Sequence, residues 1–210
     1  MSADATRSPR QYDSTLRRRQ AEGTRRAVLD AASRLFSGRG WTVGMREIAS
    51  AAGVSVETVY ANFGSKSQLL EQVLDVAVVG DDEPVSLMDR PEFTALGHGS
   101  QVQRAAAAAR LATAVNGRTA GLQRALREAA AAEPGLAARL EDARERQRLT
   151  VRAAVSMLTG READATEAEG LSAVVSDEVY ELLTDSTGWS PAKYEEWLTG
   201  VLVRLFDLQQ

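Results

Sequence analysis

The stretch MREIASAAGVSVETVYANFG, residues 45–64, decides the fold. Its apolar residues recur at helical spacing in two short runs, over about 45–52 and 56–63, and Gly53 separates the runs. Ser55 fits the N-cap of the second run. Two short helices joined by a turn with glycine are typical of a helix-turn-helix, whose second helix enters the major groove of DNA. An ordinary helical hairpin has the same pattern, so the motif alone leaves both interpretations open.

Helical patterns continue on both sides of this stretch. Before it, apolar residues over about 16–36 recur at helical spacing, and a pair of glycines ends the run. After it, Ser65 and Gln68 have the spacing of a capping box and open a helix that reaches about residue 79. The remaining segments are a linker over 80–99 with one short helix after Pro91, and helices over about 100–115, 118–132, 134–158, 166–182 and 190–206.

Composition supports an all-α protein that is not an enzyme. The chain has 210 residues, of which 35 are alanine, the residue that favours helices most. Because there is no cysteine, disulfides, thiolate metal sites and cysteine nucleophiles are excluded. A single histidine, His98, also excludes a metal site built from several histidines. We therefore assign no catalytic residue, no metal ligand and no cofactor.

Charge divides the chain into two parts. Residues 1–66 carry eleven Lys and Arg against six Asp and Glu, a balance of +5, whereas residues 67–210 carry 14 against 23, a balance of −9. A basic segment on an acidic body favours a polyanion partner for the basic part, although a basic disordered tail gives the same count. No run reaches the about 18 to 20 apolar residues of a membrane span, and the N-terminus lacks the apolar core of a signal peptide. We therefore expect a soluble cytoplasmic protein with no membrane partner.

The N-terminal third resembles a known family. AVLDAASRLFSGRGW, followed by MREIASAAGVSVETVYANFGSKSQLLEQVL, makes residues 25–74 similar to the DNA-binding domain of TetR-type bacterial transcriptional regulators. The resemblance implies a homodimer that presents two helix-turn-helix units to a palindromic operator, and a C-terminal bundle whose small-molecule effector releases the DNA. One departure is Gly44, which stands where a Thr or Ser normally caps the second helix. A hydroxyl contact to phosphate is then missing at this helix start, while its amides can still hold a phosphate.

The resemblance also assigns roles to residues of the second and third helices. Tyr60, Asn62 and Lys66 match positions that contact backbone phosphates, and Arg46 is long enough to reach one. Glu57 stands where Gly or Ala is frequent; it can accept from the N4 amino group of cytosine, or it is a solvated residue that suits a first helical turn. The predicted DNA-binding residues are Arg46, Ser55, Val56, Glu57, Thr58, Tyr60, Ala61, Asn62 and Lys66.

The chain is predicted to hold three parts. Residues 1–16 are expected to be a disordered arm, 17–66 a three-helix DNA-binding domain, and 67–210 a helical bundle for effector binding and dimerisation. The arginines at 17–19 either add a contact to the minor groove or to phosphates, or belong to a flexible basic tail with non-specific attraction only.

The bundle offers a ligand cavity and a dimer seam. No spacing among its polar residues demands a ligand, so no effector-binding residue is assigned, and Arg118 fits a solvated charge or an ion-pair partner. The candidate polar groups for a cavity are His98, Asn116, Arg118, Asp177, Glu178, Tyr180 and Trp189, of which His98 fits an exposed loop. The bulky apolar residues of roughly 166–184 and 190–208 are the predicted dimer seam, with two helices from each chain. Their alternative role is packing within one chain.

The sequence therefore predicts a sequence-specific DNA-binding transcriptional regulator, a repressor that a small molecule releases from a palindromic operator. The alternative is a helical protein that binds a small molecule or a partner and does not read DNA. Salt-sensitive binding to DNA fragments separates the two, because phosphate contacts release counterions.

Overall fold

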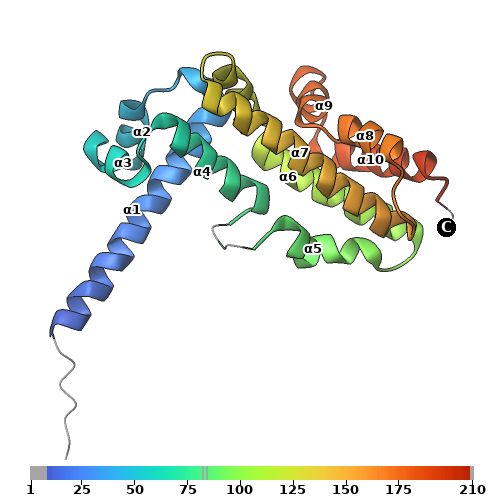
Figure 1. The fold of residues 1–210 in the computed structure, drawn as a ribbon, viewed down its shortest axis with the longest axis horizontal. Helices are drawn as coiled ribbons and strands as arrows, with labels where there is room; N and C mark the ends of the chain where they lie inside the picture. The colour runs from blue at the N-terminus through green and yellow to red at the C-terminus, as the bar shows by residue number, and fades with distance from the viewer. Residues whose placement is uncertain (1–8, 82, 84, 209–210) are drawn as a thin grey trace, which may run out of the picture.

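The computed structural model describes residues 9–81, 83 and 85–208, and every regular element in this part of the chain is helical (Figure 1). The predicted all-α class is confirmed. The N-terminal elements are α1 (Pro9–Arg39), η1 (Gly40–Thr42), α2 (Met45–Ala52), α3 (Val56–Phe63) and α4 (Lys66–Val79). The body holds η2 (Leu87–Asp89), α5 (Pro91–Thr94), η3 (Ala95–Gly97), α6 (Gln101–Ala130), α7 (Pro134–Thr159), α8 (Ala165–Val174), α9 (Asp177–Glu181), the π-helical η4 (Leu182–Ser186) and α10 (Pro191–Leu205). In the described ranges, no helix is long and apolar enough to cross a membrane.

Local signals predicted most helix ends correctly. The helices on either side of Gly53 have the predicted bounds. The predicted capping box at the start of α4 is present, because the Ser65 hydroxyl accepts the Gln68 amide at 3.1 Å and the Gln68 side chain accepts the Ser65 amide at 3.0 Å. Pro134 occupies the first turn of α7, and Ser190 caps α10.

The first helix is longer than expected. It begins at Pro9, so the prediction of a disordered arm over 1–16 is wrong for residues 9–16, while residues 1–8 lie outside the described residues. Proline suits the first turn of a helix, and no further glycine or proline follows until Gly23. The local sequence therefore has no signal that stops the helix between Pro9 and Gly23.

One helix, α6, replaces the two helices predicted over 100–132. The expected break falls at Asn116 and Gly117, two residues of low helix propensity. In the fold, the buried Asn116 amide donates to the Val175 carbonyl at 3.0 Å, and a Cβ on Gly117 would lie 3.3 Å from the Tyr180 hydroxyl. Tertiary contacts thus use both residues and override their helix propensity.

The segment after α7 also differs from the prediction. The cap of α8 is Asp164, not Thr166, since the Asp164 carboxylate accepts the amides of Thr166 at 2.8 Å and Glu167 at 3.4 Å. The helix then ends at Val174, and Ser176 caps α9 separately. The predicted single helix over 166–182 is therefore two helices joined by a turn.

The N-terminal helices share one hydrophobic core with the C-terminal half of α6. Phe36, Ile48 and Val59 from α1, α2 and α3 are fully buried there. Leu122 and Leu126 from α6 join them in the same cluster. A second core, around Tyr194 and Leu198 of α10, lies along the other half of α6. The predicted domain boundary at residues 66 and 67 falls in the first turn of α4, whose buried face packs on both α1 and α6.

The end of α1 and α6 cross at backbone contact. A Cβ on Gly121 would lie 2.7 Å from the Ser37 carbonyl oxygen, closer than a real Cβ approaches another atom. Arg124 donates to the same carbonyl at 2.7 Å, and the Glu128 carboxylate accepts the Trp41 amide at 2.7 Å. This crossing fixes the N-terminal helices to the body.

The substitution Gly121→Ala tests this crossing. Alanine favours a helix over glycine by about 1 kcal/mol, but the added methyl group would overlap the Ser37 main chain, so we expect a net loss of about 1–3 kcal/mol of stability. The control is Gly170→Ala in α8, where an added Cβ would meet no atom within 4 Å and should stabilise by about 0.5–1 kcal/mol. Urea unfolding of the two variants measures both effects, and equal stabilisation would contradict the close crossing.

Candidate functional site

The second and third helices form the predicted helix-turn-helix. Gly53 has a φ of 70°, in the left-handed region that favours glycine. The amide of Val54 donates to the Ala49 carbonyl at 3.0 Å, and the Ser55 hydroxyl accepts the Thr58 amide at 3.2 Å. Main-chain bonds and one cap therefore hold α3 at a fixed orientation on α2.

One face of α3 is buried and the opposite face is exposed. Val59 and Phe63 are 0% and 3% exposed, whereas Tyr60 is 50% exposed. Of the predicted DNA-binding residues, the exposed ones are Arg46, Ser55, Glu57, Tyr60, Ala61 and Asn62, and the half-buried ones are Val56, Thr58 and Lys66. Most of the predicted residues are therefore accessible to a partner.

The start of α2 is already occupied by a carboxylate. The Gly44 amide donates to the Glu47 side chain at 2.8 Å, and Glu47 also pairs with Arg39 at 2.6 Å. The main-chain bond from Gly44 and the bond with Arg39 lower the pKa of Glu47. This contact of Glu47 was not expected from the sequence; it takes the Gly44 amide, whereas the hydroxyl that the family has at this position would accept an amide of the first helical turn.

Lys66 lies against a tryptophan. Its ammonium group donates to the Trp41 carbonyl and stands 3.8 Å from the centroid of the Trp41 ring. Burial lowers the pKa of Lys66. The side chain that we expected on a phosphate therefore holds the turn η1, which leads from α1 into α2.

A large cavity lies in the body. Its volume is about 1020 Å³, and its wall comes from the end of α4, from residues 85–96 and from helices of the bundle. The wall is mostly apolar, with residues such as Leu74, Phe93, Leu111, Val115 and Leu202. Cavities of this kind accept small organic molecules, which a few polar groups orient.

The polar candidates named from sequence are divided between two places. Asn116, Asp177 and Glu178 line the large cavity. Arg118, Tyr180 and Trp189 line a separate cavity of about 410 Å³, and His98 is exposed and lines neither cavity.

Arg118 connects α6 to α4. Its guanidinium group donates to the Ala77 carbonyl at 2.8 Å and to the Val78 carbonyl at 3.1 Å. These carbonyls belong to the last turn of α4 and have no partner within that helix, so the arginine satisfies them. Arg118 is exposed, as expected of a solvated charge, but these two contacts with α4 were not predicted from the sequence.

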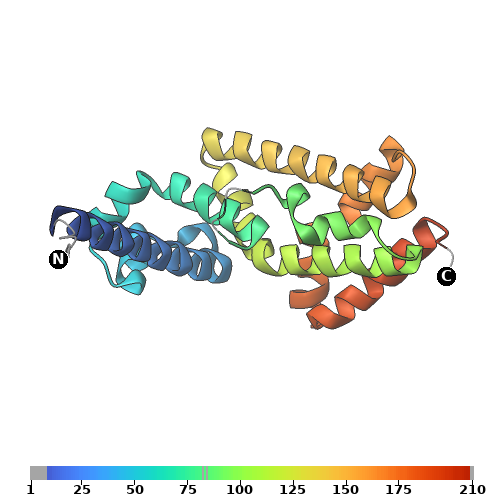
Figure 2. The ribbon, with the colours of Figure 1, turned by 90° about the horizontal axis from the view of Figure 1, so that it is seen from below.

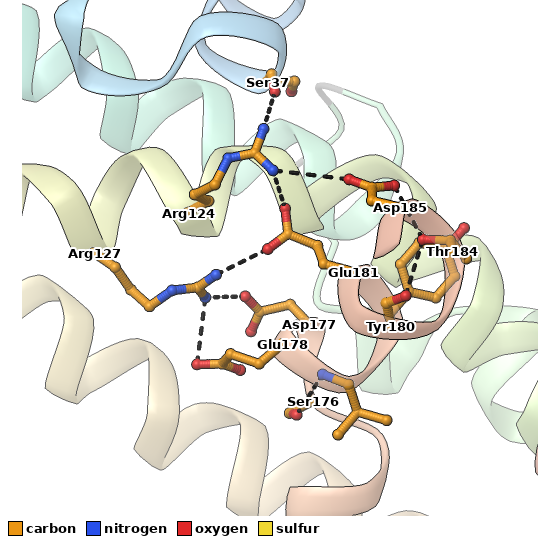
Figure 3. Close-up of polar contacts among 11 residues, drawn as sticks. Ser37, Arg124, Arg127, Ser176, Asp177, Glu178, Tyr180, Glu181, Thr184 and Asp185 are labelled. Atoms are coloured by element: carbon orange, nitrogen blue, oxygen red, sulfur yellow. Dashed lines mark hydrogen bonds and ion pairs between the residues drawn. The ribbon is translucent and has the colours of Figure 1, made fainter. Parts of the chain in front are cut away.

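A chain of ionic contacts runs from the large cavity to α1 (Figure 3). Arg127, which lines the cavity, pairs with Asp177 and donates to Glu181 at 3.0 Å. Glu181 also pairs with Arg124 at 2.6 Å, and Arg124 donates to the Ser37 carbonyl at 2.7 Å. Sequence analysis named Asp177 but missed the two arginines, because their spacing in a long helix carries no distinguishing pattern.

Carboxylates outnumber guanidinium groups in this chain of contacts. Besides Asp177 and Glu181, Glu178 lies 3.4 Å from Arg127, and Asp185 is the fourth carboxylate of the group. Burial raises the pKa of Asp177 to about 6, although the bond to Arg127 opposes this shift. Asp177 therefore loses its proton near pH 6, whereas most carboxyl groups titrate at lower pH. The net charge at this end of the cavity changes in the same pH range.

Comparison with known families agrees with the geometry of the helix-turn-helix. Residues 28–73 match the model of the tetR family of bacterial regulatory proteins, and this range holds all of α2 and α3. The resemblance that the sequence motifs indicated is confirmed. Among curated proteins, none matches the chain significantly.

Solved structures extend the likeness to the whole fold. A member of the TetR family from Streptomyces coelicolor A3 is 23% identical, with a TM-score of 0.59 over 89% of this chain and 99% of that chain. A TetR-like transcriptional regulator from Rhodococcus sp. RHA1 is 18% identical, with a TM-score of 0.61 over 86% and 94%. The TetR family transcriptional regulator PfmR from Thermus thermophilus is 16% identical, with a TM-score of 0.60 over 87% and 98%. The two-part helical fold is therefore shared with these proteins.

The raised pKa of Asp177 predicts how stability depends on pH. A carboxyl group with a pKa of about 6 in the folded chain, against 3.8 ordinarily, holds its proton more tightly when folded. Its contribution to stability is therefore full below about pH 4 and is lost as pH rises through about 6. The Asp177→Asn variant lacks this carboxyl group, so the stability difference between the wild type and the variant isolates its contribution. We expect that the free energy of unfolding of the wild type, relative to the variant, is about 1–3 kcal/mol lower at pH 7 than at about pH 4.

Urea denaturation across this pH range measures the difference, and Glu178→Gln is the control. Burial opposes the shift, but a main-chain hydrogen bond and Arg127 lower the pKa of Glu178. The free energy of unfolding of the wild type, relative to that of Glu178→Gln, should therefore rise with pH. A flat difference for Asp177→Asn would show that this carboxyl group is not perturbed.

Proposed function

We propose that this chain, whose DNA-binding helices and fold are of the TetR type, is a sequence-specific DNA-binding transcriptional regulator. We further propose that it is a homodimeric repressor and that a small-molecule effector releases it from a palindromic operator. The observation that carries the proposal is the exposed face of α3, which a tight turn and a Ser55 cap hold beside α2.

The shape of α3 supports insertion into DNA. A helix with side chains is about 10–12 Å wide, and the major groove is about 12 Å wide. Small residues such as Ser55 and Ala61 occupy exposed positions, so the helix can come close to base edges. Its buried residues fix it to the domain, so that its position does not depend on the DNA.

The exposed side chains divide into two chemical classes. The Tyr60 hydroxyl, the Asn62 amide and the Arg46 guanidinium are donors that suit phosphate oxygens. Glu57 accepts only, so it suits an amino group on a base edge and not a phosphate. Lys66 contributes indirectly in this proposal, because its contacts with Trp41 fix the turn before α2.

The cavity and its ionic contacts support control by an effector. A molecule in the cavity lies beside Arg127 and Asp177, and the contacts of Arg127 continue through Glu181 and Arg124 to Ser37. A second route is α4, whose residue Leu74 also lines the cavity. Linkage requires that an effector that weakens DNA binding is itself bound more weakly by the DNA complex.

The last helices support a homodimer. Leu182 and Leu205 belong to the predicted seam segments and are 57% and 51% exposed, so both are available to pack against a second copy of the chain. Tyr194 and Leu198 of the same helix α10 are fully buried within the chain. Leu205 lies on the same side of α10 as these two residues but at the C-terminal end of the helix, so the apolar stripe of α10 runs from the core at its start to an exposed surface, the proposed seam, at its end.

The first test of the proposal concerns the two chemical classes on α3. Selection from a random duplex pool should enrich a palindromic site. Affinity should fall steeply with salt: in a plot of log affinity against log salt concentration, each phosphate contact should add about −0.9 to the slope. Tyr60→Phe removes one donor and should weaken binding several-fold on all duplexes alike, whereas Glu57→Gln should change the preferred base at one position. Glu92→Gln makes the same change at an exposed residue of α5 and should leave both properties intact. Binding without enrichment of any sequence would refute a sequence-specific regulator.

The second test concerns the dimer seam. Leu182→Glu combined with Leu205→Glu places charges on the exposed apolar surface and should give a folded monomer in analytical ultracentrifugation, because charges are depleted at the centre of such interfaces. Leu149→Glu is the matched control, since Leu149 is 54% exposed on α7, outside the proposed seam. A double variant that stays a dimer would place the seam elsewhere.

A further inference from the structure

The N-terminal part of α1 stands apart from the rest of the molecule. The helix has 31 residues, which is about 46 Å at the usual rise per residue. Its first buried residue is Val28, and residues 16–23 are exposed at every position. In Figures 1 and 2 this part projects from the end of the molecule that carries α3, far from α10. We call residues 16–27 the basic extension.

The charge of the basic extension is strongly positive. It holds five arginines, at 17–19 and at 25 and 26, against one acid, Glu22. Arg18 and Glu22 are 3.6 Å apart, with side chains 75% and 66% exposed, so this pair neutralises little of the surrounding charge. Successive residues of a helix point about 100° apart, so the arginines at 17–19 span an arc of about 200° around the helix. More than half of the circumference of the extension therefore presents guanidinium groups to a polyanion.

The extension leaves the domain beside α3. The Arg25 guanidinium stands 5.0 Å from the centroid of the Phe63 ring, and Phe63 is the last residue of α3. Arg25 also donates to the Gln72 side chain at 2.6 Å. When α3 lies in a major groove, the basic extension thus starts next to the strand backbone that borders this groove.

The helical state decides which part of DNA the extension can reach. A flexible arginine arm can enter the minor groove, which is about 6 Å wide, but a helix about 10–12 Å across cannot. The partner that suits exposed arginines beside an occupied major groove is the phosphate backbone, which carries no base sequence.

We propose that the basic extension is a second DNA contact, which lies along the phosphate backbone that flanks the site read by α3. The proposal rests on the proposed function, since it requires that α3 binds DNA. This second contact extends the stretch of duplex that the protein binds beyond the recognised bases, and its share of the affinity does not depend on base sequence.

The experiment compares duplexes of two lengths and uses the full chain. The probe is a site selected by the protein from a random pool, either blunt at its recognised bases or extended by one helical turn on each side. The wild type should bind the extended duplex at least several-fold more tightly than the blunt one. The variant Arg17→Gln, Arg18→Gln, Arg19→Gln should lose this gain and show a shallower salt slope, by about 0.9 for each phosphate that it no longer neutralises. The control variant Arg148→Gln, Arg152→Gln, Arg161→Gln removes the same charge from exposed positions of the body and should behave as the wild type.

Two further comparisons separate a helix from a flexible arm. Flanks rich in A·T and flanks rich in G·C should give the same gain, whereas an arginine in the minor groove would favour A·T. Ala21→Pro keeps every charge but breaks the helix at an exposed position, so it should reduce the gain. Equal affinity of the wild type for blunt and extended duplexes, or a gain that depends on A·T flanks, would overturn the inference while the proposed function stands. Failure to select any site would refute the proposed function itself.

Discussion

The contact on which the rest of the structure depends is the crossing of α6 over the end of α1. Gly121 allows the two backbones to touch at Ser37, and Arg124 and Glu128 bond the main chain on either side of the contact. Because interiors are close-packed, such a contact transmits a displacement instead of absorbing it. A side chain at 121 would separate the helices and open the core that α1–α4 share with α6.

The crossing also explains why the body and the N-terminal helices cannot be treated as independent units. Arg118 ties α6 to the last turn of α4, and Arg124 ties it to the last turns of α1. The ionic contacts that begin at the large cavity end at the same Arg124. In the proposed function, an effector therefore acts on both attachments.

Residues with a local role were predictable from sequence, and residues with a tertiary role were not. Ser55, Gly53 and Pro134 act within a few residues of their own position, so caps, turns and helix starts were predicted correctly. Asn116 was predicted to end a helix because asparagine has a low helix propensity, and its hydrogen bond to the Val175 carbonyl cannot be seen in the sequence. Lys66 was expected on a phosphate because it matches such a position in the family, and its contact with Trp41 was not predictable because no periodicity joins the two residues. The family resemblance supplied the residues expected to bind DNA, but it could not indicate that Glu47 accepts the Gly44 amide before α2 or that the first helix begins at Pro9.

Hydrogen–deuterium exchange of the full chain with and without a selected duplex tests the central claim most directly, because it needs no knowledge of the effector. If α6 couples the two parts, DNA binding must change protection in residues 121–130 of α6 and in α9 and η4, as well as in α1–α4. Linkage makes this reciprocal: a cavity that controls DNA binding must respond to DNA. Protection confined to α1–α4, with α6, α9 and η4 unchanged, would contradict the account.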